Sequence, residues 1–125
     1  MSASARETLG PRQRLRHTTD FRDAYDQNRR WHGRYMVLFL RAAPDASRRL
    51  GVVASKRVGN AVERARAKRR LREAFRRQRT TLSAPFSDDV VLVARRSILS
   101  APWPDVVADL LHLARQAGLI PPATP

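Results

Sequence analysis

The chain has 125 residues, which is enough for one domain with a modest core. Its 25 lysine and arginine residues outnumber 11 acidic residues and give a formal net charge of +14. This excess favours a polyanionic partner, because each phosphate that is neutralised releases condensed counterions. The absence of cysteine excludes a disulfide scaffold, a thiol nucleophile and a zinc site built on thiolates.

The ends of the chain differ in composition from its middle. Residues 1–16 are predicted to form a flexible basic arm, because Pro11 and the arginines after it follow no helical or strand period. The arm lacks the apolar stretch of a secretory signal, and no apolar run is long enough to cross a bilayer. We therefore expect a cytoplasmic protein without a membrane partner. A single domain is expected over residues 17–118, with a Pro-rich tail at 119–125.

The first half of the domain predicts one helix and two strands. The helix is expected to start at Thr18-Thr19-Asp20, which offers an N-cap, and to end near Asn28. Residues 34–40 and 49–55 are rich in strand-forming side chains. Pro44 favours a turn between them, so the two strands are predicted to pair as a hairpin.

The second half predicts a long helix, a buried strand and a last helix. The long helix is expected over residues 60–80, after Gly59. Residues 88–95 contain a continuous apolar run typical of a buried strand. The last helix is expected to open around Pro102–Asp105 and to close at Gly118. This order of elements predicts a mixed α/β (α+β) two-layer sandwich.

The long helix has one apolar stripe and one strongly basic side. Ala67, Leu71, Ala74 and Phe75 fall within a narrow arc that can dock on a sheet. Like charges one turn apart destabilise an isolated helix, and an anionic partner would relieve this repulsion. The density of charge alone does not separate RNA from DNA. The basic side comprises Arg64, Arg66, Lys68, Arg69, Arg70, Arg72, Arg76, Arg77 and Arg79.

No arrangement of side chains predicts a catalytic or metal site. His17, His32 and His112 are scattered without ligand spacing. Asp88 and Asp89 are adjacent at a strand start, so their side chains point to opposite faces, and we interpret them as a strand entry. A protein nuclease needs grouped carboxylates or a histidine-based acid and base, and the sequence offers neither.

The segment from Gly51 to Phe75 carries a more specific pattern. It resembles the signature of the bacterial ribonuclease P protein subunit: a strand ending in Ser-Lys, a Val-Gly-Asn-Ala-Val turn, Arg-x-Arg, and then Lys-Arg with further basic residues. Ala65 stands where the family pattern has an asparagine, so a hydrogen bond from that side chain is unavailable here. The matching residues are Ser55, Lys56, Val58, Gly59, Asn60, Ala61, Val62, Arg64, Arg66, Lys68, Arg69 and Arg72.

The resemblance implies a fold as well as a function. The family fold has the order αβββαβα and an uncommon left-handed βαβ crossover, similar to the second domain of a small-subunit ribosomal protein. It implies a short additional strand near Trp31–Gly33 or Val58. Handedness rules alone would predict a right-handed crossover.

The resemblance implies that an RNA subunit with bound Mg²⁺ removes the 5′ leader of precursor tRNA, while the protein assists without catalytic residues of its own. No protein partner is expected to be required, and no residue is assigned to a metal. The residues implied to bind the RNA subunit are Asn60, Arg64, Arg66, Lys68, Arg69 and Arg72. The residues implied to line or rim a cleft for the single-stranded leader are Phe21, Tyr25, Phe39, Lys56 and Arg57.

Alternatives remain at this stage. Phe21, Tyr25 and Phe39 could be ordinary core residues, and Trp31 and Trp103 are expected to pack. A ribosomal or general RNA-binding protein of the same fold would have similar charge, and only the helix motif separates the two. A DNA-binding regulator would show a helix-turn-helix pair or a zipper, and the sequence shows neither.

Overall fold

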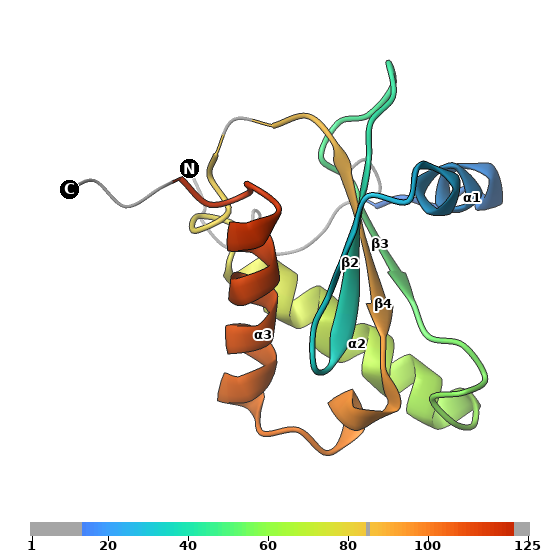
Figure 1. Cartoon of the computed structure of the whole chain (residues 1–125). Coiled ribbons are helices and arrows are strands. Elements are labelled where there is room, and N and C mark those ends of the chain that lie inside the picture. The colour runs from blue at the N-terminus through green and yellow to red at the C-terminus, as the bar shows by residue number, and fades with distance from the viewer. Residues whose placement is uncertain (1–13, 85, 122–125) are drawn as a thin grey trace, which may run out of the picture.

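A computed structural model describes residues 14–84 and 86–121, and Figure 1 shows its arrangement. The predicted order of elements is confirmed, with one short 3₁₀ helix in addition. The helix and strand predictions are each correct to within a few residues at their ends. In chain order the elements are α1 (Thr18–Gln27), β1 (Arg30–His32), β2 (Met36–Arg41), β3 (Leu50–Val53), α2 (Ala61–Arg77), β4 (Asp89–Ala94), η3 (Arg96–Leu99) and α3 (Trp103–Gln116).

The described strands form one sheet in the order β1-β2-β4-β3. β2 pairs antiparallel with β1 and with β4, whereas β3 pairs parallel with β4. The predicted hairpin between the second and third strands is therefore wrong. β4 lies between them because its apolar residues 90–94 can bury both faces of the strand only inside the sheet.

The sheet separates two layers of unequal depth. α2 and α3 cover one face and bury the larger apolar cluster, which includes Leu38, Leu71, Leu92 and Leu110. α1 alone covers the other face, over a smaller cluster around Phe39 and Val91 (Figure 1). We call these the closed face and the open face. The predicted mixed α/β fold is confirmed, with one four-stranded sheet and three α-helices in the described part of the chain.

The unit β3-α2-β4 is a βαβ crossover between parallel neighbours. Its left-handed sense stays a prediction. The short strand implied near Trp31–Gly33 is confirmed as β1, and the interpretation of Trp31 and Trp103 as packing residues is confirmed by their contact with the larger cluster.

The start of α1 differs from the sequence prediction, whereas its end near Asn28 agrees with it. The N-cap of α1 is His17, whose side chain makes no capping bond, so Thr18-Thr19-Asp20 lies inside the first turn and not before it. Asn28 ends α1 in the left-handed conformation, as its small polar side chain allows.

The packed part of the chain reaches beyond residues 17–118 at both ends. Leu15 is buried and donates its N–H to the Leu50 carbonyl, and Leu119 is buried beyond α3. The rest of the predicted arm, 1–13, and of the tail, 122–125, lies outside the described residues, and the domain boundaries stay predictions.

Candidate RNA interface

The start of α2 is fixed by a capping box. The Asn60 side chain accepts the N–H of Glu63, and the Glu63 carboxylate accepts the N–H of Asn60, at 2.9 and 3.0 Å. Gly59 precedes the cap with φ of 150°, and a Cβ there would lie 2.2 Å from the Glu63 carboxylate. Asn60, predicted to contact RNA, therefore has a structural role in setting where the basic helix begins.

Some of the basic side chains of α2 are bound within the protein. Arg70 donates to the carbonyl of Ala101 at 2.7 Å and lies over the ring of Trp103. Arg76 and Arg77 both donate to Glu73, and these two hydrogen bonds lower the pKa of Glu73 to about 2. Part of the basic side predicted from the sequence thus stabilises the closed layer.

The five basic residues singled out by the motif behave differently. Within the described residues, none of them makes a hydrogen bond or an ion pair. Burial, and after it the charge of Arg14, lower the pKa of the Arg72 guanidinium group. The five residues, from exposed to half-buried, are Arg66, Arg69, Arg64, Lys68 and Arg72.

The predicted leader residues Phe21, Tyr25 and Phe39 meet on the open face. The Tyr25 and Phe39 rings contact edge to face, with 5.0 Å between their centroids. Phe21 packs on Gly51, where a Cβ would lie 2.5 Å from its ring. Phe39 is 8% exposed and Tyr25 is 38% exposed, so Tyr25 presents the larger aromatic surface to solvent. Partial burial still raises the pKa of the Tyr25 hydroxyl.

Lys56 and Arg57 lie in an exposed turn directly after β3. The Arg57 N–H donates to the Ser55 hydroxyl, and Arg96 donates to the carbonyl of Val58 at 2.9 Å. Buried Val58 anchors this turn between the sheet and α2. The two cations therefore lie between the β3 edge of the sheet and the start of the basic helix.

The sequence analysis did not identify the surface beside the aromatic residues. Val37, Val93 and Val53 are directly opposed on β2, β4 and β3, and each is half-buried on the open face. They form an apolar row next to the aromatic cluster. Alternation along each strand could have found the outward valines, but their alignment requires the strand order.

A buried arginine attaches α1 to the sheet beside this surface. Arg41, 5% exposed, donates to Asp23 of α1 at 3.0 Å, to Asp89 of β4 at 2.8 Å and to Asp45 at 2.9 Å. Asp20 of α1 is a further ion-pair partner at 3.2 Å. One guanidinium group thus joins the helix, the β2–β3 loop and the central strand.

Asp89 is the fully buried member of this network. Its burial raises the pKa, but hydrogen bonds from the Arg49 side chain, from the N–H groups of Arg49 and Ser47, and from Arg41 lower it below the usual value. Asp88 instead pairs with Arg29 at 3.0 Å. The two carboxylates have separate partners, in agreement with their interpretation as a strand entry.

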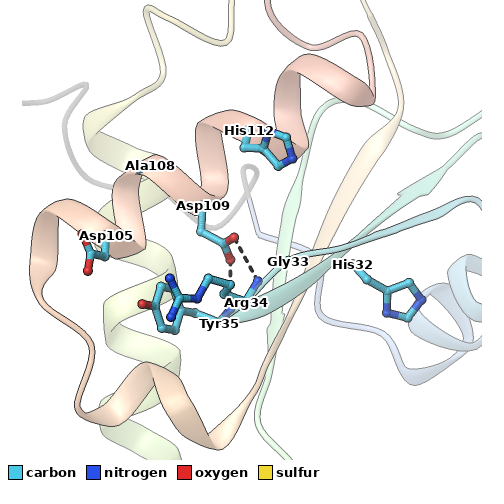
Figure 2. A pocket seen from close by; sticks show the side chains of 8 residues that line it. All are labelled: His32, Gly33, Arg34, Tyr35, Asp105, Ala108, Asp109 and His112. Carbon is cyan, nitrogen blue, oxygen red and sulfur yellow. Dashed lines mark hydrogen bonds between the residues drawn. The ribbon is translucent and has the colours of Figure 1, made fainter.

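A pocket of about 490 Å³ lies on the other side of the sheet, between the β1–β2 turn and α3 (Figure 2). Asp109 accepts the N–H groups of Arg34 and Tyr35, each at 3.0 Å. A Cβ on Gly33 would lie 2.4 Å from the same carboxylate. The central polar group of the pocket therefore serves to attach α3 to the turn, and none of the predicted RNA-binding residues lines it.

In 14–84 and 86–121 no group of three histidine or acidic side chains is placed to hold a metal ion. None of the helices there combines the length and apolar character that a bilayer span requires.

Comparisons with known proteins agree with this geometry. The sequence profile of the family described as Ribonuclease P matches residues 9–118. A protein of Desulfovibrio desulfuricans named ribonuclease P protein component is 39% identical over 116 residues, covering 89% of this chain and 88% of that protein. A protein of the same name from Chloroflexus aurantiacus is 36% identical, with coverage of 89% and 82%.

Solved structures give the same result. The RNase P protein from Thermotoga maritima superposes with a TM-score of 0.69 at 29% identity, covering 82% of this chain and 96% of that one. The RNase P protein of Staphylococcus aureus gives a TM-score of 0.73 at 25% identity, with coverage of 87% and 98%.

Proposed function

The chain belongs to the ribonuclease P protein family, and from this premise we propose that it helps an RNA catalyst remove the 5′ leader of precursor tRNA. As a family member it has a role in tRNA processing, within an endoribonuclease ribonucleoprotein whose partner is the ribonuclease P RNA. The alternative of a ribosomal or general RNA-binding protein is not favoured. The division of work between protein and RNA is our proposal.

The observation that carries this proposal is the division of the basic residues on α2. Arg70, Arg76 and Arg77 are bound within the protein, whereas the five motif residues are free of hydrogen bonds and ion pairs in the described ranges. Unpaired guanidinium groups aligned on one helix bind phosphates bidentately and release counterions. We assign the binding of the RNA subunit to Arg64, Arg66, Lys68, Arg69 and Arg72.

The open face suits the single-stranded leader. Aromatic side chains accept unstacked bases with little sequence preference, at about 1–3 kcal/mol per base. Tyr25 offers such a surface, the buried ring of Phe39 and the ring of Phe21 support it, and Lys56 and Arg57 add charge at the β3 edge. We propose that precursor tRNA is recognised here through its leader.

We further propose that hydrolysis is carried by the RNA subunit with Mg²⁺. The acidic residues of the described network are bound to arginines: Asp89, Asp45 and Asp23 all accept from Arg41. Carboxylates held in this way support a structural role over general acid or base chemistry. The protein then contributes charge neutralisation and substrate positioning, in the cytoplasm and without a protein partner.

Reconstitution tests this function. The purified protein is mixed with a bacterial ribonuclease P RNA, precursor tRNA and Mg²⁺ near physiological salt. We expect leader removal that requires the RNA and is enhanced by the protein. Cleavage by the protein alone, or no enhancement, would contradict the proposal.

Replacement of the α2 cations tests their assignment. Arg66→Gln with Arg69→Gln should weaken binding to the RNA subunit and reduce the slope of log K against log salt by about one for each lost phosphate contact. Arg115→Gln is the matched control, because this arginine is exposed on α3 and its side chain makes no hydrogen bond or ion pair within the described residues. An unchanged slope in the double variant would refute the assignment.

A further inference from the structure

The apolar row of the open face continues onto the edge strand. His32 of β1 is directly opposite Val37, which is opposite Val93, which is opposite Val53. Directly opposed residues point to the same side of a sheet, so His32 extends the row on the open face. His32 also borders the pocket beside α3, but Figure 2 shows its ring turned away from Asp109 and His112, on the other side of β1. The row therefore crosses all four described strands and ends at an imidazole.

The ring of His32 lies against Arg95. The Arg95 Nη2 lies 3.2 Å from His32 Nδ1, and its Nε donates to the carbonyl of Gly33 at 2.9 Å. Because a guanidinium group has only donors, Nδ1 accepts in this contact, which leaves Nε2 to carry an N–H. His32 is exposed, so this N–H is available to a ligand on the side of the ring away from Arg95.

Arg30 adds a charge on the same side. It lies two residues before His32 on β1 and opposite Phe39, so the alternation of the strand places both residues on the open face. Arg30 is exposed and makes no ion pair or hydrogen bond within the described residues. A guanidinium group and an N–H donor side by side are suited to the oxygens of a phosphodiester.

We propose that Arg30 and His32 form a subsite for a phosphate of the distal leader, an inference that rests on the proposed function of the open face. The distance from the first to the last of four neighbouring strands is about 14 Å. Successive nucleotides of a duplex strand rise by about 3.4 Å, so the row is long enough to contact more than one nucleotide. Lys56, Arg57 and α2 lie at the β3 end of the row. A leader that enters beside the RNA subunit at that end reaches β1 only with its nucleotides farthest from the cleaved bond.

A series of precursor tRNAs with increasing leader length tests the subsite in the reconstituted ribonucleoprotein. Arg30→Gln and His32→Ala should each lower affinity about tenfold for long leaders, as expected for a lost charge-assisted hydrogen bond, and leave short leaders unaffected. His32→Gln keeps an N–H donor and should recover most of the loss. His112→Ala and Arg115→Gln, exposed on α3, are the matched controls.

Neutralising single leader phosphates as methylphosphonates identifies the group that is bound. A methylphosphonate at one distal position should lower the affinity of the unchanged protein and have no effect on the affinity of the Arg30→Gln variant. An effect that follows the base at that position, and not the phosphate, would overturn the phosphate assignment.

The outcomes also separate this inference from the proposed function. If Arg30→Gln and His32→Ala lower the affinity equally for short and long leaders, or for no leader, the subsite is overturned. The proposed function of the open face still stands in that case, provided that Tyr25→Ala reduces the preference for precursor tRNA. If Tyr25→Ala has no effect on that preference either, the proposed leader function of the open face fails as well.

Discussion

The two faces of the sheet differ in how completely helices cover them. α2 and α3 bury the closed face under a continuous apolar cluster, whereas α1 leaves Val37, Val53 and Val93 half-exposed on the open face. The difference indicates a division of labour, because complete burial stabilises the fold and incomplete burial leaves apolar surface for a ligand. The predictions below test this division.

The largest effect is expected from neighbouring residues of β4. Leu92 is fully buried on the closed face, so Leu92→Ala should lower the free energy of unfolding by about 2–5 kcal/mol. Val93→Ala on the open face should cost about 1 kcal/mol, because less apolar area is lost. Urea unfolding measures both values, and equal losses would contradict the division between the faces.

Removal of the buried guanidinium group tests how α1 is held. Arg41→Met leaves Asp89 buried with one arginine fewer and should destabilise the protein by about 3 kcal/mol. Arg115→Met, at an exposed position of α3, should change the unfolding free energy by less than about 0.5 kcal/mol. Similar values for both variants would show that the network contributes little.

Acid should weaken both layers. The pKa values of Asp89, Asp45 and Glu73 are lowered in the folded protein, so the stability that they contribute is complete above their unfolded values and is lost as pH falls. For Glu73 the loss extends from about pH 4.5 to about pH 2. The free energy of unfolding should decrease as the pH is lowered through this range, and Asp89→Asn should make that decrease smaller. A curve that is flat already in the unchanged protein would refute the linkage.

The sequence predicted the closed layer better than the open face. The motif and the apolar stripe of α2 located the basic helix and its docking side, because both depend on residues close in the chain. The pairing of β2 with β4 and the alignment of His32 with the valine row depend on strand order, which the local pattern did not contain. Because β2 and β3 are adjacent in the sequence, a hairpin between them was expected, but the apolar strand β4 lies between them in the sheet.

The basic residues of α2 show the same limit. Sequence analysis grouped nine cations on one side, yet the structure binds Arg70 to the start of α3 and Arg76 and Arg77 to Glu73. The partners of Arg70, the Ala101 carbonyl and Trp103, lie far along the chain from α2, and a helical projection cannot identify them. Glu73 lies one turn from Arg76 and Arg77 on the same helix, so a projection can show that pairing.

The most direct test of the open face compares the affinities of the reconstituted ribonucleoprotein for precursor and mature tRNA. Tyr25→Ala removes an exposed aromatic surface beside Phe39. It should weaken precursor binding by about 1–3 kcal/mol and leave mature tRNA unaffected. Asp26→Ala, on an exposed position of the same helix, controls for changes in α1. Equal weakening of both tRNAs, or an unchanged ratio, would contradict the leader-binding role of this face.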